Sequence, residues 1–404
     1  MLCQWAHTYD ISPEDLRSIV RTFGSVFPQG TLWMVGGGDL LLIGARDGDI
    51  LPRLASVETA VRRGAVAATL TDVGISEGTA AFALLSQFAA GPREMERYGA
   101  GAFIQTDDRT ALEYSAPRGI YGRSREDNGA AIRALAAERP AAVRDAFDRA
   151  DDAAWVSRGR MDLRAQAYGN AYEAFTKAVR LNSRNANALS GLSDSAGGAG
   201  KLDEERQSLR EIATGEPGNA NARIELSRVL AVMGDVPAAL QMASEALQLA
   251  PGDPRAAEQL ASILADSGDG DRLAPLADAM VGRFPDRMEA RYYRATALYL
   301  RGQTQDAIAA ARQVVDAQPD HTRAQSLLGA ACAAAGRRDC AMTAFAAAIR
   351  GNPRDASGYV NAGLLSLQSG NTSGAADYFA SALTIDPSSK PARDGLAQAR
   401  TPKF

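Results

Sequence analysis

The chain contains few of the residues from which catalytic and metal-binding sites are usually built. Its 404 residues include three cysteines and two histidines. The cysteines, Cys3, Cys332 and Cys340, are too few for a disulfide framework and lack the spacing of zinc ligands. His7 and His321 lie far apart in the sequence, and no Ser/His/Asp or Cys/His set can be recognised. The sequence therefore indicates no catalytic residue, no metal and no cofactor.

Charge and hydropathy exclude two further classes of protein. The formal net charge is −4 and the isoelectric point is about 5.5, which gives no electrostatic reason to expect nucleic acid as a partner. No run of 18 uncharged apolar residues exists, so no membrane span is predicted. The first residues, MLCQWAHTYDISPED, have neither the basic nor the apolar region of a signal peptide. We therefore expect a cytoplasmic protein.

A period of 34 residues fills the C-terminal half of the chain. It is marked by two series of residues: Pro217, Pro251, Pro285, Pro319, Pro353 and Pro387, and Gly200, Gly234, Gly268, Gly302, Gly336 and Gly370. Apolar and small residues between these marks recur with the spacing of one helical face. The glycines permit a tight turn between two helices, and the prolines end the second helix. A two-helix unit cannot bury its apolar face alone, so neighbouring units must stack.

This pattern resembles the tetratricopeptide repeat. Trp155, Gly159, Ala171, Phe175 and Ala178 match the signature of that family in the first copy. Seven copies are predicted over 152–389: 152–185, 186–219, 220–253, 254–287, 288–321, 322–355 and 356–389. A capping helix and tail are predicted over 390–404. The fold is thus expected to be mostly α, a tetratricopeptide-repeat solenoid.

The resemblance also implies which residues face a partner. In such repeats the first helices line the concave face, and the second, fifth, ninth and twelfth residues of each copy point inward. They include Asn187, Asn221, Arg228, Arg255, Glu289, Tyr292, Tyr299 and Arg323. Arginine, tyrosine and asparagine suit a protein or peptide ligand, because they offer forked donors, rigid contact area and amide pairing. The alternative is a solvated inner face without a dedicated ligand.

Cys332 and Cys340 stand on either side of the predicted turn at Gly336. On an antiparallel helical hairpin they would lie roughly level with one another. A disulfide between them is geometrically possible, but two buried small residues are the preferred interpretation.

Residues 1–118 lack the 34-residue period and have a different pattern of predicted helices and strands. SPEDLRSIVRTFGSVF reads as a helix that begins after Ser12, and TLWMV and LLLIGA read as buried strands. Further helices are expected in 51–64 and 76–90, and 119–151 is read as a linker with short helices. The glycines of VGGGD between the strands could suggest a phosphate-binding loop. Such a loop needs a helix after it, and a strand follows here, so we predict a hairpin turn instead.

The segments LCQWAHTYDISPEDLRSIVRTFGSVFP, TLWMVGGGDLLLIGA and QTDDRTALEYSAPR resemble the C-terminal third of spermidine synthase-like domains. Such domains occur in bacterial proteins that fuse a transporter-like segment to tetratricopeptide repeats. The resemblance implies a truncated α/β methyltransferase-like fragment, in which residues 2–6 end the fifth strand and the hairpin forms strands six and seven. It also implies that the nucleotide-binding loop and the catalytic aspartate would lie upstream, and that a larger fused protein would sit at the inner membrane.

Asp107, Asp108 and Glu113 form the one acidic cluster of this region that could attract a polyamine. The alternative is a turn followed by a solvated strand edge. Three strands without their neighbours would expose an apolar face and an open edge, so the fragment is expected to need a partner, such as the missing half of the domain.

Two functions follow from the sequence. The first is a scaffold for protein–protein interaction that carries an incomplete, inactive spermidine synthase-like domain. The second is the tail of a polyamine synthase-like aminopropyltransferase whose catalytic half is missing or lies on another chain.

Overall fold

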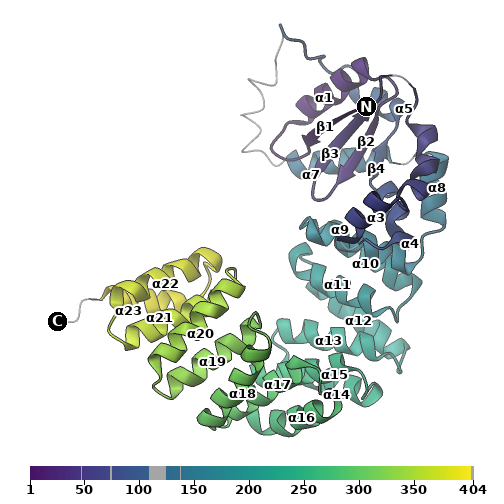
Figure 1. Cartoon of the computed structure of the whole chain (residues 1–404). Helices are drawn as coiled ribbons and strands as arrows, with labels where there is room; N and C mark the ends of the chain where they lie inside the picture. The colour runs from purple at the N-terminus through teal and green to yellow at the C-terminus, as the bar shows by residue number, and fades with distance from the viewer. Residues whose placement is uncertain (47, 73–74, 109–123, 137, 402–404) are drawn as a thin grey trace. The chain divides into compact units, whose positions relative to one another are not determined.

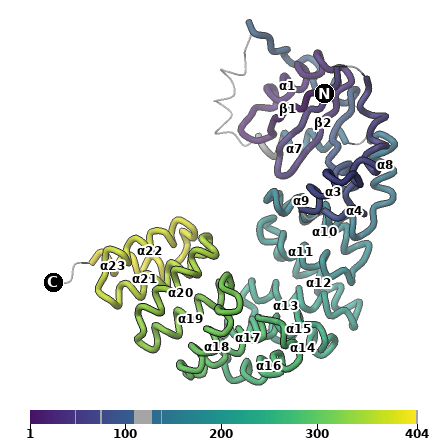
Figure 2. The backbone as a smooth tube through the Cα atoms, viewed as in Figure 1, coloured from purple at the N-terminus to yellow at the C-terminus, as the bar shows by residue number. Residues whose placement is uncertain are grey.

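The structure is a computed structural model that describes residues 1–401 except 47, 73–74, 109–123 and 137. The chain divides into two compact units, Met1–Glu225 and Leu226–Phe404, which we describe separately. Both units are mostly helical, and the first also contains a small sheet (Figures 1 and 2). Among the described residues, no helix combines the length and the apolar character that crossing a membrane requires.

The sheet of the first unit is antiparallel throughout. In the described residues its strands are β1 (Leu2–His7), β2 (Thr31–Val35), β3 (Asp39–Gly44) and β4 (Phe88–Ala90), in the order β1-β3-β2-β4. The strands β2 and β3 pair directly across the glycine turn, where Gly36 and Gly38 have φ values of 57° and 131°. The predicted hairpin is therefore confirmed, and these glycines form its turn.

One face of the sheet packs against α1 (Pro13–Val26). This helix begins as predicted: the Ser12 side chain accepts a hydrogen bond from the Asp15 N–H, and proline occupies the first turn. Leu16, Val20 and Phe23 of α1 form a core with residues of β2 and β3. The helix α7 (Ser124–Leu135) also joins this face through Ile132, which is fully buried.

The opposite face of the sheet is covered by a second set of helices. Trp33 and Ile43 pack there against η1 (Leu51–Ser56), α4 (Glu77–Leu85) and α8 (Ala141–Asp148). Phe82, Phe147 and Trp155 meet edge to face, with ring centroids 4.9–5.7 Å apart. Because Trp155 belongs to the first repeat, the sheet and this repeat share one core. The sheet is thus covered on both faces, as its apolar strands predicted.

Two predicted helices of this unit are shorter than expected. The helix expected over 76–90 ends at Leu85, and residues 88–90 instead form β4. The physical reason is the free edge of β2: the Met34 N–H donates to the Gln87 carbonyl, and the Phe88 ring packs on Trp33. The helix expected over 51–64 is replaced by η1 and the single turn α2 (Val57–Ala60), followed by α3 (Gly64–Asp72).

Helical hairpins follow in chain order. Between residues 152 and 400, all of which are described, each predicted copy contains one pair of helices and a final helix follows. The helices are α9 (Asp152–Arg164), α10 (Tyr168–Leu181), α11 (Ala186–Ala199), α12 (Leu202–Gly215), α13 (Ala220–Val232), α14 (Val236–Leu249), α15 (Pro254–Asp266), α16 (Gly270–Arg283), α17 (Met288–Leu300), α18 (Thr304–Ala317), α19 (Thr322–Ala334), α20 (Arg338–Gly351), α21 (Ala356–Gln368), α22 (Thr372–Ile385) and α23 (Lys390–Arg400). The six glycines predicted in the turns all have positive φ, from 68° to 82°.

Phenylalanine rings of the second helices rest on glycines of the first helices. Phe175 is fully buried, and a Cβ added to Gly159 or Gly191 would come within 2.8 or 2.3 Å of its ring. Phe379 is enclosed in the same way by Gly363 and Gly395, at 2.8 and 2.4 Å. Each ring therefore fixes how closely the two helices of one repeat, and the first helix of the next unit, can approach.

We expect Gly191→Ala to destabilise the first unit by about 1–3 kcal/mol, because the added methyl group overpacks the Phe175 site. Gly197→Ala, in the same helix, is the matched control, since a Cβ there has nothing within 4 Å. The control should gain about 0.5–1 kcal/mol from its higher helix propensity. Urea unfolding followed by circular dichroism measures both changes, and equal midpoints for the two variants would contradict this packing.

Candidate functional site

The predicted asparagines of the first unit hold the repeats to one another. The Asn187 Oδ1 accepts a hydrogen bond from Arg160 of α9 at 2.9 Å. The Asn221 Nδ2 donates to the Arg184 carbonyl at 3.0 Å. Both amides therefore already serve contacts within the chain.

Arg228 and Arg255 lie on α13 and α15. The Arg255 guanidinium binds Asp253, with an Nη2–Oδ2 distance of 2.5 Å, and Asp253 also caps the start of α15. Arg228 is half-buried. Arg228 and Arg255 are therefore not part of the group that Tyr292 and Arg323 form on α17 and α19.

The predicted residues Tyr292 and Arg323 do lie together, on α17 and α19. The Arg323 guanidinium stands 4.5 Å from the centroid of the Tyr292 ring and 5.3 Å from that of Tyr293. It also donates a hydrogen bond to the Tyr293 hydroxyl at 3.3 Å. The His321 ring lies 5.4 Å from Tyr292. We call these four residues, Tyr292, Tyr293, His321 and Arg323, the tyrosine–arginine cluster.

An ion-pair chain that begins beside this cluster reaches the preceding repeat. The predicted residue Glu289 lies one turn before Tyr292 on α17, and its carboxylate is 3.8 Å from Arg287. Arg287 in turn binds Glu258 of α15 at 2.6 Å. Burial raises the pKa of Glu258, and Arg287 opposes that shift. The helices α15, α17 and α19 touch in sequence, so these groups form one continuous strip.

Tyr299 lies near the other end of α17, where it is half-buried and packs against the core of the following repeats. Tyr292 packs against the same core, and the contacts that define the tyrosine–arginine cluster do not include Tyr299.

The sequence prediction missed two members of the cluster. Tyr293 is 2% exposed, and burial raises its pKa. His321 is the N-cap of α19, where its Nδ1 accepts a hydrogen bond from the Ala324 N–H at 3.2 Å. Both fall outside the four inward positions of the repeat. Their position in the chain could have indicated them, because Tyr293 directly follows the predicted residue Tyr292 and His321 closely precedes the predicted residue Arg323.

The acidic residues proposed for polyamines are not assembled in the described residues. Asp107 and Asp108 are exposed in a turn, and Glu113 lies outside the described residues. In the part of the chain that the structure covers, no group of three or more His, Cys, Asp or Glu side chains is arranged to hold a metal ion.

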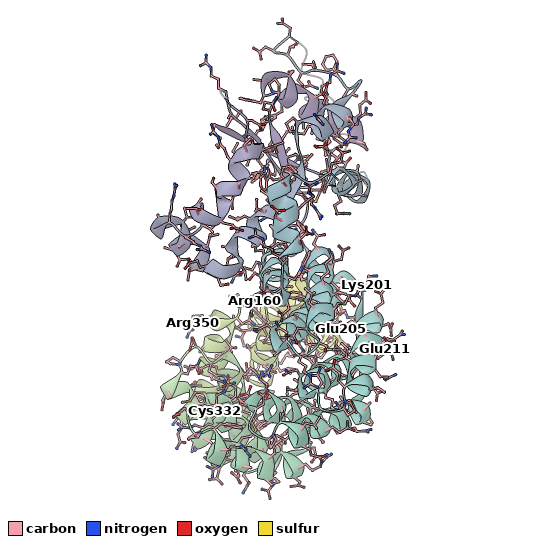
Figure 3. All side chains as sticks on the ribbon, turned by 90° about the vertical axis from the view of Figure 1, so that its right-hand side faces the viewer. Arg160, Lys201, Glu205, Glu211, Cys332 and Arg350 are labelled. Atoms are coloured by element: carbon pink, nitrogen blue, oxygen red, sulfur yellow. A yellow bond between two sulfur atoms is a disulfide. The ribbon has the colours of Figure 1, made fainter. Side chains whose placement is uncertain are left out.

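The structure corrects the interpretation of Cys332 and Cys340. They form a disulfide, with their Cα atoms 5.9 Å apart. The tight turn at Gly336 brings the end of α19 level with the start of α20, which places the two sulfur atoms in reach. Cys332 is buried within the repeats (Figure 3), and Cys340 is half-buried. The preferred interpretation of two separate thiols is therefore wrong.

Comparison with known proteins confirms the repeats over residues 196–390. Models of the tetratricopeptide repeat family match residues 196–263, 258–322, 301–347 and 333–390. No curated protein sequence matches the chain. The resemblance of residues 1–118 to spermidine synthase-like domains receives no support from these matches, which all lie after that region.

Several solved structures are similar to the chain. A tetratricopeptide repeat protein from Parabacteroides merdae is 16% identical, with a TM-score of 0.51, over 61% of this chain and 98% of that one. A thermophilic repeat protein from Thermus thermophilus is 21% identical, with a TM-score of 0.42, over 45% and 98%. YrrB, described as a repeat protein with an unusual peptide-binding site, is 19% identical, with a TM-score of 0.32, over 47% and 97%. At these identities only the first similarity is informative, and it shows the fold.

The tyrosine–arginine cluster should lose stability in acid through His321. Burial lowers the pKa of His321, Arg323 lowers it further, and Glu289 opposes both. The folded state thus favours the neutral ring, whose stabilising effect is present above the unfolded pKa of about 6.5 and is lost as the pH falls toward the folded value.

Unfolding midpoints should therefore decrease between about pH 7.5 and about pH 5, and His321→Asn should show a smaller decrease, because asparagine caps the helix without titrating. Identical pH profiles for the two proteins would contradict this role for His321.

Proposed function

Residues 196–390 are tetratricopeptide repeats, and we propose that the chain is a scaffold that binds a peptide segment of a partner protein on the strip formed by α15, α17 and α19. The observation that carries the proposal is the tyrosine–arginine cluster. Two aromatic rings and a guanidinium come together there from neighbouring first helices. Tyrosine and arginine are among the residue types that most often dominate the binding energy of protein interfaces.

The cluster is organised before any ligand binds. Arg323 is held between two tyrosines, so little side-chain entropy remains to be lost on binding. Its guanidinium has five N–H groups, and the contacts to Tyr292 and Tyr293 use two of them. The others suit a carboxylate of the ligand, while the half-buried ring of Tyr292 offers rigid apolar area.

The charge of the strip further restricts the ligand. Arg323 provides positive charge at one end, and Glu258 and Glu289 share the single positive charge of Arg287, which leaves net negative charge toward α15. A peptide with an acidic residue, an apolar or aromatic residue and a basic residue in that order along the strip would match both ends. Selection from a random peptide library against the intact protein should recover sequences of this kind.

Substitution of Arg323 or Tyr292 by alanine should weaken the selected peptide at least tenfold, about 1.4 kcal/mol, when fluorescence anisotropy measures the dissociation constant. Arg301→Ala is the matched control, because Arg301 is an exposed arginine of the repeat that contains Tyr292 and pairs with Asp271 at 3.2 Å. Its affinity should equal that of the unchanged protein. Peptides that bind all three variants alike would place the site elsewhere.

The second candidate is the polyamine-synthase tail. One observation favours it: β1 is an edge strand in the described residues, and Leu2 and Trp5 on it are 46% and 56% exposed. An edge of this kind could pair with a further strand. Asp107 and Asp108 are exposed and could attract an ammonium group. No similarity to a known protein supports this candidate.

We expect the chain by itself to transfer no aminopropyl group from decarboxylated S-adenosylmethionine to putrescine, because no residue in it matches the catalytic aspartate of the family. Product formation measured by chromatography is the test. Turnover that Asp107→Asn abolishes would reverse the order of the two candidates.

A further inference from the structure

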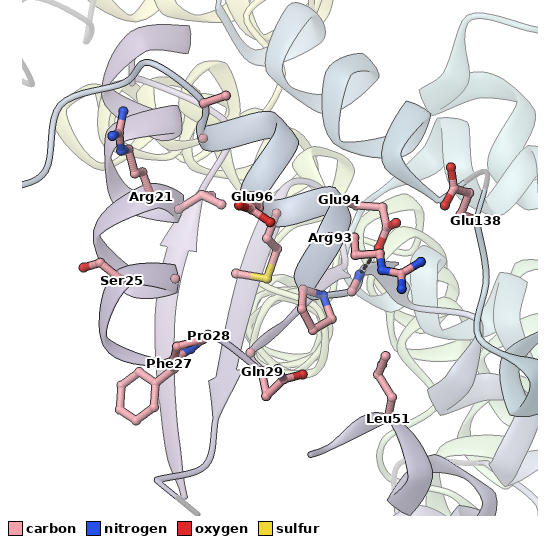
Figure 4. Close-up of a pocket in the computed structure, with 18 of the residues that line it drawn as sticks. Arg21, Ser25, Phe27, Pro28, Gln29, Leu51, Arg93, Glu94, Glu96 and Glu138 are labelled. Atoms are coloured by element: carbon pink, nitrogen blue, oxygen red, sulfur yellow. Dashed lines mark hydrogen bonds between the residues drawn. The ribbon is translucent and has the colours of Figure 1, made fainter. Parts of the chain in front are cut away.

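A large cavity lies within the first unit, away from the repeat strip. Its volume is about 1270 Å³, and it is bounded by α1, α5 (Pro92–Gly99) and the segment that joins α7 to α8. Figure 4 shows Arg21 and Ser25 of α1 at one end, and Arg93 of α5 with Glu138 at the other. The cavity is large enough for a small organic molecule.

Four carboxylates line this cavity; Glu96 is exposed, and the other three, Asp49, Glu94 and Glu138, are already engaged. Glu94 and Glu138 both accept hydrogen bonds from Arg97, each at 3.2 Å. Glu94 also accepts a hydrogen bond from the Gly91 N–H at 3.0 Å, and Asp49 accepts one from the Leu51 N–H at 2.9 Å. Their capacity to neutralise further cations at the cavity is therefore reduced.

Three arginines that line the cavity are not engaged in this way. The side chains of Arg93, Arg139 and Arg144 make no hydrogen bond or ion pair with the residues that the structure describes. The Nε atom of Arg139 is buried without an acceptor, and its guanidinium lies 3.7 Å over the Phe147 ring. Burial lowers the pKa of Arg139. A buried donor without a partner is rare in folded proteins and calls for an acceptor.

We propose that this cavity binds a small organic anion that carries phosphate or carboxylate groups. Arg93, Arg139 and Arg144 supply the forked donors that such groups prefer. Gly24 and Gly101, where a Cβ would have nothing within 4 Å, leave backbone open at the wall. This binding is independent of the peptide strip, because the cavity lies wholly within residues 1–225.

Isothermal titration calorimetry of the full chain with inorganic phosphate, pyrophosphate and citrate tests the proposal. At least one probe should bind saturably, with a dissociation constant below about 1 mM. A preference for pyrophosphate over citrate would identify a phosphorylated ligand, and the reverse preference would identify a polycarboxylate.

Arg144→Gln and Arg139→Gln should each weaken the bound probe at least tenfold. Arg144 is exposed, so its variant keeps the test valid if the loss of the Arg139–Phe147 contact unfolds the domain. Arg63→Gln is the matched control, because Arg63 is exposed, lies outside the cavity and also has no side-chain partner among the described residues. Its affinity should be unchanged.

Three results would overturn the proposal: no saturable binding of any probe, unchanged affinity in the folded Arg144→Gln variant, or an equal loss in Arg63→Gln. None of them would affect the peptide site, whose variants lie on α17 and α19.

Discussion

The packing of the second helix of each repeat on a small residue of the first helix is the contact on which the rest of the repeat structure depends. Where the second helix carries phenylalanine, at Phe175, Phe345 and Phe379, the facing position on the first helix is glycine. Where the second helix carries alanine, as at Ala277 and Ala311, the first helix carries Ala261 and Ala295 at that position. In both kinds of repeat a small residue of the first helix faces the second helix, which lets the two helices pack at close spacing. The binding strip can exist because this spacing brings successive first helices into contact.

The same physics explains how much of the fold could be predicted. Helix pairs, turn glycines and the β2–β3 hairpin depend on residues that are close in sequence, and all were predicted. The strand β4 was not, because FAA after Gln87 has no strong preference of its own and becomes a strand only by pairing with β2. The site was predicted in part. Tyr292 and Arg323 follow from the inward positions of the repeat, whereas Tyr293 and His321 join them through contacts that no periodicity encodes.

The two candidate binding regions differ from the rest of the surface in whether their arginines have a carboxylate partner within the chain. Most of the positive charge of this chain is arginine, and many of these groups are used internally, as Arg255 with Asp253 and Arg287 with Glu258 show. Arg323 instead faces aromatic rings, and Arg93, Arg139 and Arg144 of the cavity have no carboxylate partner among the described residues. A guanidinium without an internal acceptor retains its donors for an external one. Both proposals therefore rest on one principle, applied to different ligands.

The disulfide constrains the turn between the two helices of one repeat. It closes a hairpin of repeat six beside the Gly329–Phe345 contact, so the covalent link and the packing constrain the same turn. Disulfides persist in oxidising compartments and are rare in a reducing cytoplasm. The cytoplasmic assignment from the sequence rested on the small number of cysteines and on the N-terminal composition. The compartment stays a prediction; what the structure shows is that Cys332 and Cys340 of the same repeat meet across the turn at Gly336.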